Sequence, residues 1–177
     1  QRKDFFVTRF KDLQQQCAFK SLRTIDCLDI SHISGQHTLG AVVRVSQQEG
    51  FDKSAYRRYI IPSEDVKHGD DYHSVYLTTL RHLKQCHKRE ALPSLLLIDG
   101  GKGQLSSAAL AAQHCSIDIP IWAIAKGEGR RFGLEKIYRL SEQDDTRFEQ
   151  IDISPLSPAF ALLGRLRDEA HRFAITA

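Results

Sequence analysis

The sequence predicts an α/β fold in which helices cover both faces of a mixed β-sheet. The first observation is a set of three strand-like segments, at residues 24–31, 38–45 and 56–61. The second is a helical stripe of apolar positions directly after them, from Tyr72 to Leu83. The third is a pair of short apolar runs, LLLI and IWAIA, with a helical segment between them, as in parallel strands joined by a crossover helix.

The first three strands are expected to form an antiparallel meander. The segments 24–31 and 38–45 are β-branched or apolar, and the turn signal Ser34-Gly35 between them predicts a hairpin. The third strand ends at Pro62. Residues 1–23 are polar with scattered apolar positions and no clean stripe. They predict a connecting helix or linker ahead of a domain that spans residues 24–177.

The later elements follow from local signals. The stripe after Gly69 predicts an amphipathic helix. Residues 134–153 alternate around the polar turn EQDDT and predict an edge hairpin. Ser157 followed by Pro158 predicts the start of the last helix, because a hydroxyl caps the helix and the ring presets its first turn. The resulting order of three strands, helix, strand, helix, strand and late helix is that of an RNase H-like fold.

The composition excludes several classes of protein. The 177 residues are 41% hydrophobic and 27% charged, which argues against a disordered chain, a collagen-like fibre or a disulfide-rich miniprotein. The net charge of +3 allows a polyanionic partner without predicting one. The 4 cysteines contain no C-x-x-C pair, so we expect reduced, mostly buried thiols.

The chain ends and the apolar runs predict the location of the protein and its relation to a longer one. No apolar run reaches the roughly 18 residues of a membrane span, and the first residues lack a signal peptide. We therefore expect no membrane association and a cytoplasmic location. The chain begins with glutamine and contains 0 methionines. It is expected to be a piece of a longer protein.

Two aspartates occupy positions where aspartate is rare. Asp29 lies inside the strand IDCLDIS, and Asp99 ends the buried run LLLI, where open α/β sheets bind ligands. In the predicted fold these strands are neighbours, and two carboxylates about 4 Å apart repel by roughly 4 kcal/mol at an effective dielectric near 20. A shared proton or a cation must relieve this repulsion, and oxygen ligands favour Mg²⁺ or Mn²⁺ over zinc. For Asp29 alone, a strand cap or an ion pair with a basic neighbour stays open.

Two helices supply further candidates. Helical spacing places Asp71 nearer the buried stripe than Asp70, which makes Asp71 the candidate ligand and Asp70 the candidate cap. A purely capping role for both is the alternative, because acidic groups stabilise helix N-termini. His171 lies off the stripe of the last helix, on the same side as Arg167, and faces either a site or solvent.

Glycines and basic residues follow the strand ends. The loop Gly100-Gly101-Lys102-Gly103 lacks the G-x-x-x-x-G-K-[ST] spacing of a phosphate loop, so nucleotide hydrolysis is set aside. We expect its glycines to let the backbone approach a ligand beside Asp99, with Lys102 as a nearby cation. Other basic clusters suit phosphate contacts or a solvated surface. They comprise Arg57 and Arg58 between Tyr56 and Tyr59, and Lys126, Arg130 and Arg131.

Six motifs together resemble a known family. LDISHISG, YRRY, GDDY, LLLIDGGKGQL, AIAKG and RDEAHRFA, in this order, resemble the C-terminal endonuclease domain of UvrC, the nuclease subunit of bacterial nucleotide excision repair. The resemblance runs from about Thr24 to Ala177. It implies an RNase H-like fold and a divalent-metal-dependent cut in the damaged strand on the 5′ side of a lesion. It also implies Mg²⁺ or Mn²⁺ as cofactor, and damaged duplex DNA and a UvrB-type damage-recognition protein as partners.

The resemblance also assigns a catalytic and metal-binding set. Asp29 matches the aspartate of the DISH motif, and Asp71 matches the second aspartate of the DDY motif. Asp99 matches the aspartate of IDGGKGQ, and His171 matches the histidine of the DEAH-type motif. His171 either binds the metal or transfers a proton, and the sequence does not choose. The second-rank candidates for contacts with the DNA backbone are Lys102, Lys126, Arg131 and Arg167.

Two other functions compete with this one. The first is a catalytically silent RNase H-like module that binds nucleic acid or a repair partner. The second is a nuclease of the same fold that acts on RNA or a hybrid, because phosphodiester chemistry does not reveal the sugar. The family's first nuclease module and its helix-hairpin-helix pair are missing from this sequence. We therefore predict weak activity in isolation and a monomeric fragment.

Overall fold

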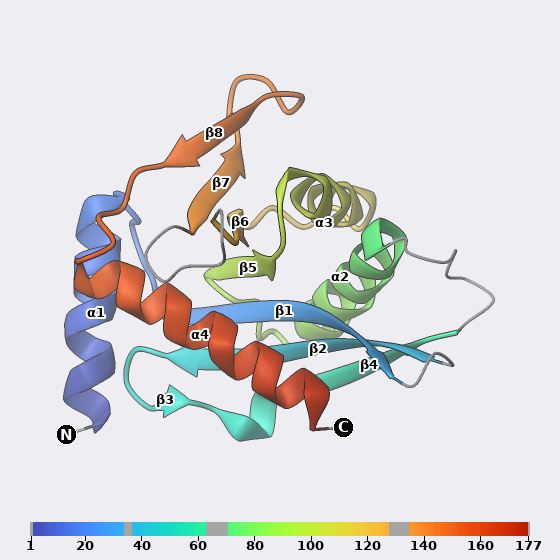
Figure 1. Cartoon of the computed structure of the whole chain (residues 1–177), viewed down its shortest axis with the longest axis horizontal. Helices are drawn as coiled ribbons and strands as arrows, with labels where there is room; N and C mark the ends of the chain where they lie inside the picture. Colours follow the sequence, from blue (N-terminus) through green and yellow to red (C-terminus); the bar gives the residue numbers. More distant parts are fainter. Residues whose placement is uncertain (1, 34–36, 63–70, 128–134, 177) are drawn as a thin grey trace.

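The computed structural model describes residues 2–33, 37–62, 71–127 and 135–176. In these residues, eight strands form one sheet in the order β3-β2-β1-β5-β6-β7-β8, and β4 also pairs with β2 (Figure 1). The strands are β1 (Thr24–Ile33), β2 (His37–Ser46), β3 (Gly50–Phe51), β4 (Arg57–Ile61), β5 (Leu95–Asp99), β6 (Ile121–Ala125), β7 (Lys136–Leu140) and β8 (Phe148–Ile151). The helices are α1 (Arg2–Gln16), η1 (Lys53–Ala55), α2 (Asp71–Lys88), α3 (Lys102–His114) and α4 (Pro158–Ile175).

The sheet is mixed, as predicted. Strand β1 pairs antiparallel with β2, and β2 pairs antiparallel with β3 and β4. The central strands β1, β5 and β6 run parallel, and β7 and β8 form the predicted antiparallel hairpin at one side. The expected turn Ser34-Gly35, and Gly69, Asp70, Arg130, Arg131 and Leu134, lie outside the described residues.

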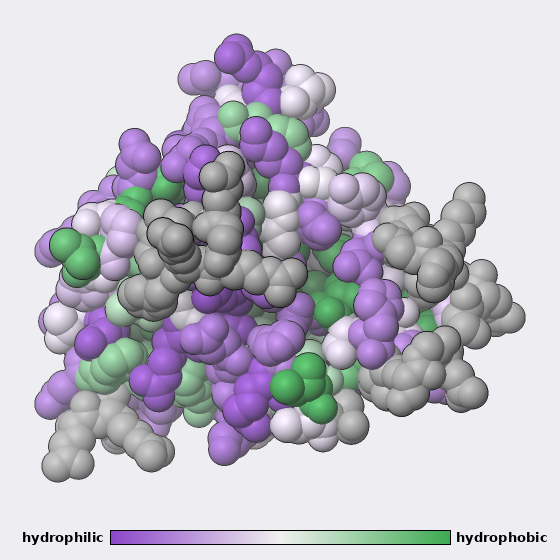
Figure 2. Space-filling view, in the orientation of Figure 1, coloured by the Kyte–Doolittle hydropathy of each residue, from purple (hydrophilic) through white to green (hydrophobic). Residues whose placement is uncertain are grey.

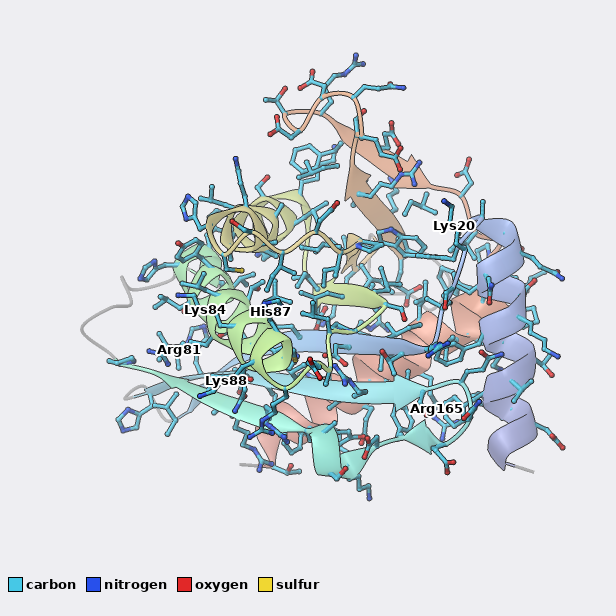
Figure 3. All side chains as sticks on the ribbon, turned by 180° about the vertical axis from the view of Figure 1, so that it is seen from behind. Lys20, Arg81, Lys84, His87, Lys88 and Arg165 are labelled. Carbon is cyan, nitrogen blue, oxygen red and sulfur yellow. The ribbon has the colours of Figure 1, made fainter. Side chains whose placement is uncertain are left out.

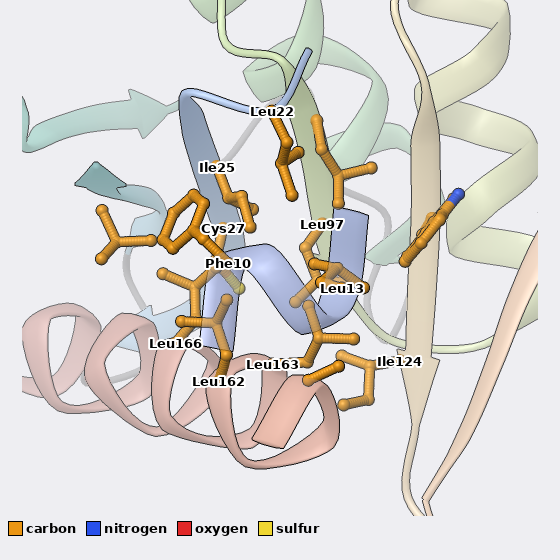
Figure 4. Packing of buried hydrophobic residues seen from close by; sticks show 14 of the residues in the cluster. Phe10, Leu13, Leu22, Ile25, Cys27, Leu97, Ile124, Leu162, Leu163 and Leu166 are labelled. Carbon is orange, nitrogen blue, oxygen red and sulfur yellow. The ribbon is translucent and has the colours of Figure 1, made fainter. Parts of the chain in front are cut away.

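Helices cover both faces of the sheet, which confirms the predicted architecture. Helices α1 and α4 lie on one face, and α2 and α3 lie on the other (Figure 1). The core beneath α4 joins Phe10 and Leu13 of α1 to Cys27 of β1, Leu97 of β5 and Leu163 of α4 (Figure 4). Residues 1–23 therefore supply buried side chains to the core of the sheet, while the domain boundary at residue 24 stays a prediction.

The start of α4 confirms the predicted cap. The Ser157 hydroxyl accepts a hydrogen bond from the Phe160 amide at 3.2 Å, and Pro158 occupies the first turn. The carboxylate of Asp12, on α1, accepts a second bond from the Ala159 amide at 2.9 Å. Because free amides at a helix start need acceptors, these bonds fix where α4 begins against α1.

The buried face of α2 agrees in part with the predicted stripe, because Val75, Thr79 and Leu83 are buried as predicted. Tyr72 is 53% exposed, whereas Ser74, Thr78 and His82 are buried against the sheet. Gly40 of β2 explains the position of Thr78, because a Cβ atom there would overlap the Thr78 side chain. The helix therefore approaches the sheet with polar side chains, a pattern that hydrophobic periodicity does not detect.

The surface and the thiols agree with the composition. Hydrophilic residues cover most of the face that α4 crosses, and hydrophobic residues form small separate patches there (Figure 2). Cys27 and Cys86 are buried, Cys17 and Cys115 are half-buried, and all are free thiols. Among the residues that the structure describes, no helix has the length and apolarity needed to cross a membrane.

Candidate active site

Asp29, within β1, and Asp99, the last residue of β5, follow the last paired residues of two parallel strands. Leu28 of β1 is in register with Ile98 of β5, so the next residue of each strand is a carboxylate. Side chains alternate along a strand, and Cys27 and Leu97 belong to the core under α4, so both carboxylates face α4. Burial and the charge of Asp29 raise the pKa of Asp99 to about 7, and hydrogen bonding with Asp29 adds to the rise.

His171 brings α4 to this pair. Its Nδ1 lies 3.2 Å from Oδ2 of Asp29, while its side chain remains 61% exposed. In the tautomer whose proton is on Nδ1, the ring donates to the carboxylate. Its Nε2 then has an available lone pair and no hydrogen-bond partner within the described part of the chain. The site therefore combines two carboxylates with a solvent-accessible imidazole.

A pocket of about 220 Å³ opens beside these groups. Its walls include Asp99, His171, Lys126 and Arg167. The Arg167 guanidinium forms an ion pair with Glu135 at 3.2 Å, and the two side chains are only 13% and 6% exposed. The pocket thus holds two cations, Lys126 and Arg167, together with the acidic groups Asp99, Glu135 and Asp168. Glu135 was not a sequence candidate, because no local pattern marked it.

Asp71 is bonded to a residue outside the predicted set. It is the first residue of α2, and its Oδ1 lies 2.8 Å from Nε2 of His32. Within the described ranges it makes no hydrogen bond to Asp29, Asp99 or His171. His32 belongs to the same LDISHISG motif as Asp29, which was the available signal for it. Side chains alternate along a strand, so a residue three positions after Asp29 points to the other face of the sheet. His32 therefore faces α2.

The glycine loop after β5 has a packing role. A Cβ atom at Gly103 would come within 2.5 Å of the Tyr72 ring, so this glycine permits α3 to pack against the start of α2. The Lys102 ammonium lies 5.1 Å from the centre of the Tyr138 ring and 5.6 Å from that of Phe148. Lys102 therefore faces the β7–β8 hairpin, whereas Lys126 and Arg167 line the pocket.

The two arginines of β4 are engaged in local structure. The Arg58 guanidinium lies 3.8 Å from the centre of the Phe173 ring and donates to the Phe173 carbonyl at 3.3 Å, near the end of α4. Arg57 donates to the carbonyls of Ser54 and Tyr56, both at 2.8 Å.

A second polar cluster lies on the opposite face of the sheet. Ligand atoms of Asp26, His82 and Cys86 all lie within 4.8 Å of one another, and all three residues are buried. Arg44 fills this cluster, because its Nε and Nη2 donate to the two Asp26 oxygens at 2.6 and 3.0 Å. The Asp26 carboxylate also accepts from His82 at 2.7 Å. An arginine thus supplies the cation, and the sulfur and imidazole donors do not suit Mg²⁺ or Mn²⁺.

This cluster predicts that stability falls at alkaline pH. Burial alone would lower the pKa of His82, but hydrogen bonds to Asp26 and Cys86 raise it to about 9, above the ordinary value of 6.5. The stability that protonated His82 provides is fully present below pH 6.5 and is lost as the pH rises through about 9. Between pH 7 and 10, the free energy of unfolding of the wild type should fall by on the order of 3 kcal/mol more than that of His82→Gln. Urea unfolding measures both proteins.

Asp26 has the opposite effect on the pH dependence, because its contribution to stability is lost at acid pH. Burial opposes ionisation of Asp26, yet hydrogen bonds from His82 and Arg44 lower its pKa below the ordinary value of 3.8. The stability that the ionised Asp26 provides is therefore present above pH 3.8 and is lost as the pH falls through the lower folded-state pKa.

The alkaline prediction has a clear contrary result. If the free energy of unfolding falls equally between pH 7 and 10 in wild type and in His82→Gln, His82 is neutral in the folded protein.

With the geometry established, comparisons with known proteins identify what the chain is similar to. The family model described as the UvrC RNase H endonuclease domain matches residues 14–175. UvrABC system protein C of Psychrobacter cryohalolentis is 40% identical over 169 residues, which are 94% of this chain and 25% of that protein. The protein of the same name from Coxiella burnetii is 38% identical over 179 residues, covering 99% of this chain and 28% of that protein. The chain therefore spans about a quarter of these relatives.

Solved structures support the fold. The crystal structure of human ENDOV superposes with a TM-score of 0.56 at 15% identity, over 99% of this chain and 94% of that chain. The catalytic domain of human Endonuclease V gives a TM-score of 0.50 at 19% identity, over 64% of this chain and 49% of that chain. Such identities bear on the fold alone, and they confirm the predicted RNase H-like sheet.

Proposed function

Because this chain belongs to the family of UvrC RNase H endonuclease domains, we propose that it hydrolyses a phosphodiester bond of damaged DNA on the 5′ side of a lesion. Its proposed partners are damaged duplex DNA and a UvrB-type damage-recognition protein, its cofactor is Mg²⁺ or Mn²⁺, and its location is the cytoplasm. The observation that carries this proposal is the pair of adjacent carboxylates, Asp29 and Asp99, with His171 beside them.

The donor set fits a hard divalent cation. Asp29 and Asp99 offer oxygen ligands, and the raised pKa of Asp99, about 7, reflects burial and a negative neighbour that a cation would offset. Asp71 is proposed as the third ligand from its place in the family motif, and its Oδ2 makes no hydrogen bond to any described residue. When bound, such a cation lowers the pKa of a coordinated water and neutralises charge on the leaving oxygen.

The remaining residues orient the substrate and move protons. Lys126 and Arg167 line the pocket and are proposed to bind non-bridging oxygens of the scissile phosphate. Glu135 holds the Arg167 guanidinium at 3.2 Å and so fixes its direction. His171, held through Nδ1, is proposed to exchange a proton at Nε2 with the attacking water or the leaving oxygen.

Metal removal tests the proposed function directly. Full-length protein and its damage-recognition partners are incubated with a 5′-labelled duplex that carries one bulky lesion, in Mg²⁺, in Mn²⁺ and in EDTA. The 5′ cut is expected with either metal and not in EDTA. A 5′ cut that persists in EDTA would contradict the proposal. One observation favours the silent-module alternative: Asp71 is bonded to His32 and, among the described residues, to none of the other proposed ligands.

His171→Ala distinguishes the two proposed roles of the histidine. If His171 transfers a proton, the single-turnover rate at saturating Mg²⁺ should fall by about 10²-fold or more, and the half-saturating Mg²⁺ concentration should stay constant. His114→Ala, at an exposed histidine that ends α3, is the matched control and should cut normally. Recovery of the rate at high Mg²⁺ would instead identify His171 as a ligand.

A further inference from the structure

Residues 56–59, the YRRY motif, point alternately to the two faces of the sheet. The Tyr59 hydroxyl donates to Gln85 of α2 at 2.8 Å. Figure 3 shows this face, with α2 in front of the strands. Tyr56, which directly precedes β4 and is also extended, and Arg58 contact α4 on the other face. Neither residue belongs to the proposed site, so their contacts with α4 call for a separate explanation.

Tyr56 holds α4 through Glu169. Its hydroxyl donates to Oε2 of Glu169 at 2.6 Å, and the centre of its ring lies 5.0 Å from that of Phe173, one turn further along the helix. Arg172 donates to both Glu169 oxygens and lowers the pKa of Glu169, so this carboxylate is charged at neutral pH. A hydroxyl that donates to a charged carboxylate forms one of the stronger hydrogen bonds in proteins.

Arg58 adds a second contact near the end of α4. Its guanidinium lies 3.8 Å from the centre of the Phe173 ring, and its Nη2 donates to the Phe173 carbonyl at 3.3 Å. The last carbonyls of a helix have no amide partner within the helix, so Arg58 supplies a donor where one is needed. We call Tyr56 and Arg58 the α4 anchor.

The α4 anchor and the candidate site contact opposite flanks of the helix. At about 100° per residue, Glu169 and Phe173 share one side of α4, and Arg167 and His171 share another side about 160° away. Ala170 is buried, and its direction lies between these two sides, so it faces the sheet. The α4 anchor therefore bonds to one flank of the helix, and the imidazole lies on the other.

The sheet beneath α4 has the same arrangement. Arg58 is in register with Ala41, and Ala41 is in register with Asp29, so these three residues form one row across β4, β2 and β1. With about 4.8 Å between strands, Arg58 and Asp29 lie about 10 Å apart along this row. The buried side of this end of α4 consists of Ala170 and Ala174. Such short side chains interlock little with a sheet, so they fix the rotation of the helix weakly.

We propose that Tyr56 and Arg58 are positioning residues for the cut, because they fix the rotation of α4 about its axis and so hold the His171 imidazole against Asp29. The ring nitrogens lie on the order of 6 Å from the helix axis, so a rotation of about 10° would displace them by about 1 Å. A displacement of about 1 Å can cost about 10²-fold in rate. This inference rests on the proposed function only for its effect on cutting, since the position of the ring can be measured without DNA or metal.

The test compares two double variants of the full-length protein. Tyr56→Phe with Arg58→Gln removes the hydroxyl and the guanidinium of the α4 anchor and keeps the aromatic ring. Tyr59→Phe with Arg89→Gln is the matched control, because it also removes one hydroxyl and one positive charge, at a tyrosine that bonds to α2 and an exposed arginine just after α2. Thermal unfolding checks that each variant is folded at the assay temperature. If the first double variant unfolds, Tyr56→Phe alone takes its place.

The first readout is the tautomer of His171 in metal-free protein without DNA. Histidine is labelled with ¹⁵N, and the His171 signals are assigned from their loss in His171→Gln. At a pH where the ring is neutral, wild type and control should carry the proton on Nδ1, as the bond to Asp29 requires. In the α4-anchor variant both nitrogen signals should shift toward those of free histidine. Identical His171 signals in this variant and the control would overturn the inference.

The second readout is the single-turnover rate of 5′ incision at saturating Mg²⁺. It should fall by about 10-fold or more in the α4-anchor variant and stay at the wild-type value in the control. In a His171→Ala background, the α4-anchor substitutions should cause no further loss, because their effect passes through the imidazole. A rate equal to that of the control, or an undiminished further loss in His171→Ala, would also overturn the inference. If wild type does not cut lesion duplex, the proposed function itself fails, and the tautomer comparison alone decides the inference.

Discussion

Asp29→Asn is expected to lower the single-turnover rate of 5′ incision by about 10³-fold or more, because several kcal/mol of charge stabilisation at the phosphate depend on the carboxylate pair. Asparagine keeps the size of the side chain and one oxygen, and it removes the negative charge. The readout is cleavage of the 5′-labelled lesion duplex by full-length protein at saturating Mg²⁺.

The same variant should be at least as stable as wild type when metal is absent. Asp29 raises the pKa of Asp99, so removing its charge relieves repulsion, and the pKa of Asp99 should move back toward its ordinary range. Thermal unfolding in EDTA measures the first effect, and carboxyl NMR titration measures the second. Asp118→Asn, at an exposed aspartate, is the control and should alter neither quantity. An active Asp29→Asn protein would remove the basis of the nuclease proposal.

Arg44→Leu is expected to destabilise the fold by about 3–5 kcal/mol, because it removes one of the two charged partners of a buried carboxylate. The Asp26 side chain is 1% exposed and accepts two bonds from Arg44, so water cannot replace the guanidinium without opening the sheet. Urea unfolding at pH 7 measures the change in the free energy of unfolding.

A triple variant separates the broken pair from the loss of packing. Arg44→Met, Asp26→Val and His82→Leu together replace the charged cluster with apolar side chains, and buried ion networks replaced in this way are often neutral or up to about 4 kcal/mol more stable. The triple variant should therefore unfold at a higher urea concentration than Arg44→Leu. If it is the less stable of the two, the cluster contributes more through its hydrogen bonds than this account allows.

Local signals were sufficient for most of the fold. The hairpin of β1 and β2, the parallel pair β5 and β6, and the capped start of α4 each depend on residues within a short window, such as Ser157 and Pro158. The buried side of α2 was predicted in part: Val75 and Leu83 are buried as expected, but His82 was missed because it is buried by pairing with Asp26, 56 residues earlier. A periodicity count treats such a histidine as solvent-facing.

The same contrast between local signals and long-range contacts applies to the candidate site. Asp29 and Asp99 could be placed together from the predicted strand order alone, because each ends or interrupts an apolar strand. The ion pair of Arg167 with Glu135 and the bond of Asp71 to His32 join elements that no local pattern connects. Long-range partners of polar groups are set by tertiary packing, so they had to come from the structure.

The bond between Asp29 and His171 joins residues 142 positions apart. Contacts of such long range form late, because closing a long loop costs entropy before any interaction compensates for it. During synthesis, α4 is the last described helix to leave the ribosome, and it brings both the imidazole and Leu163 of the core. An incomplete or unfolding chain would therefore lack a competent site, so the capacity to cut DNA and the completion of folding should arrive together.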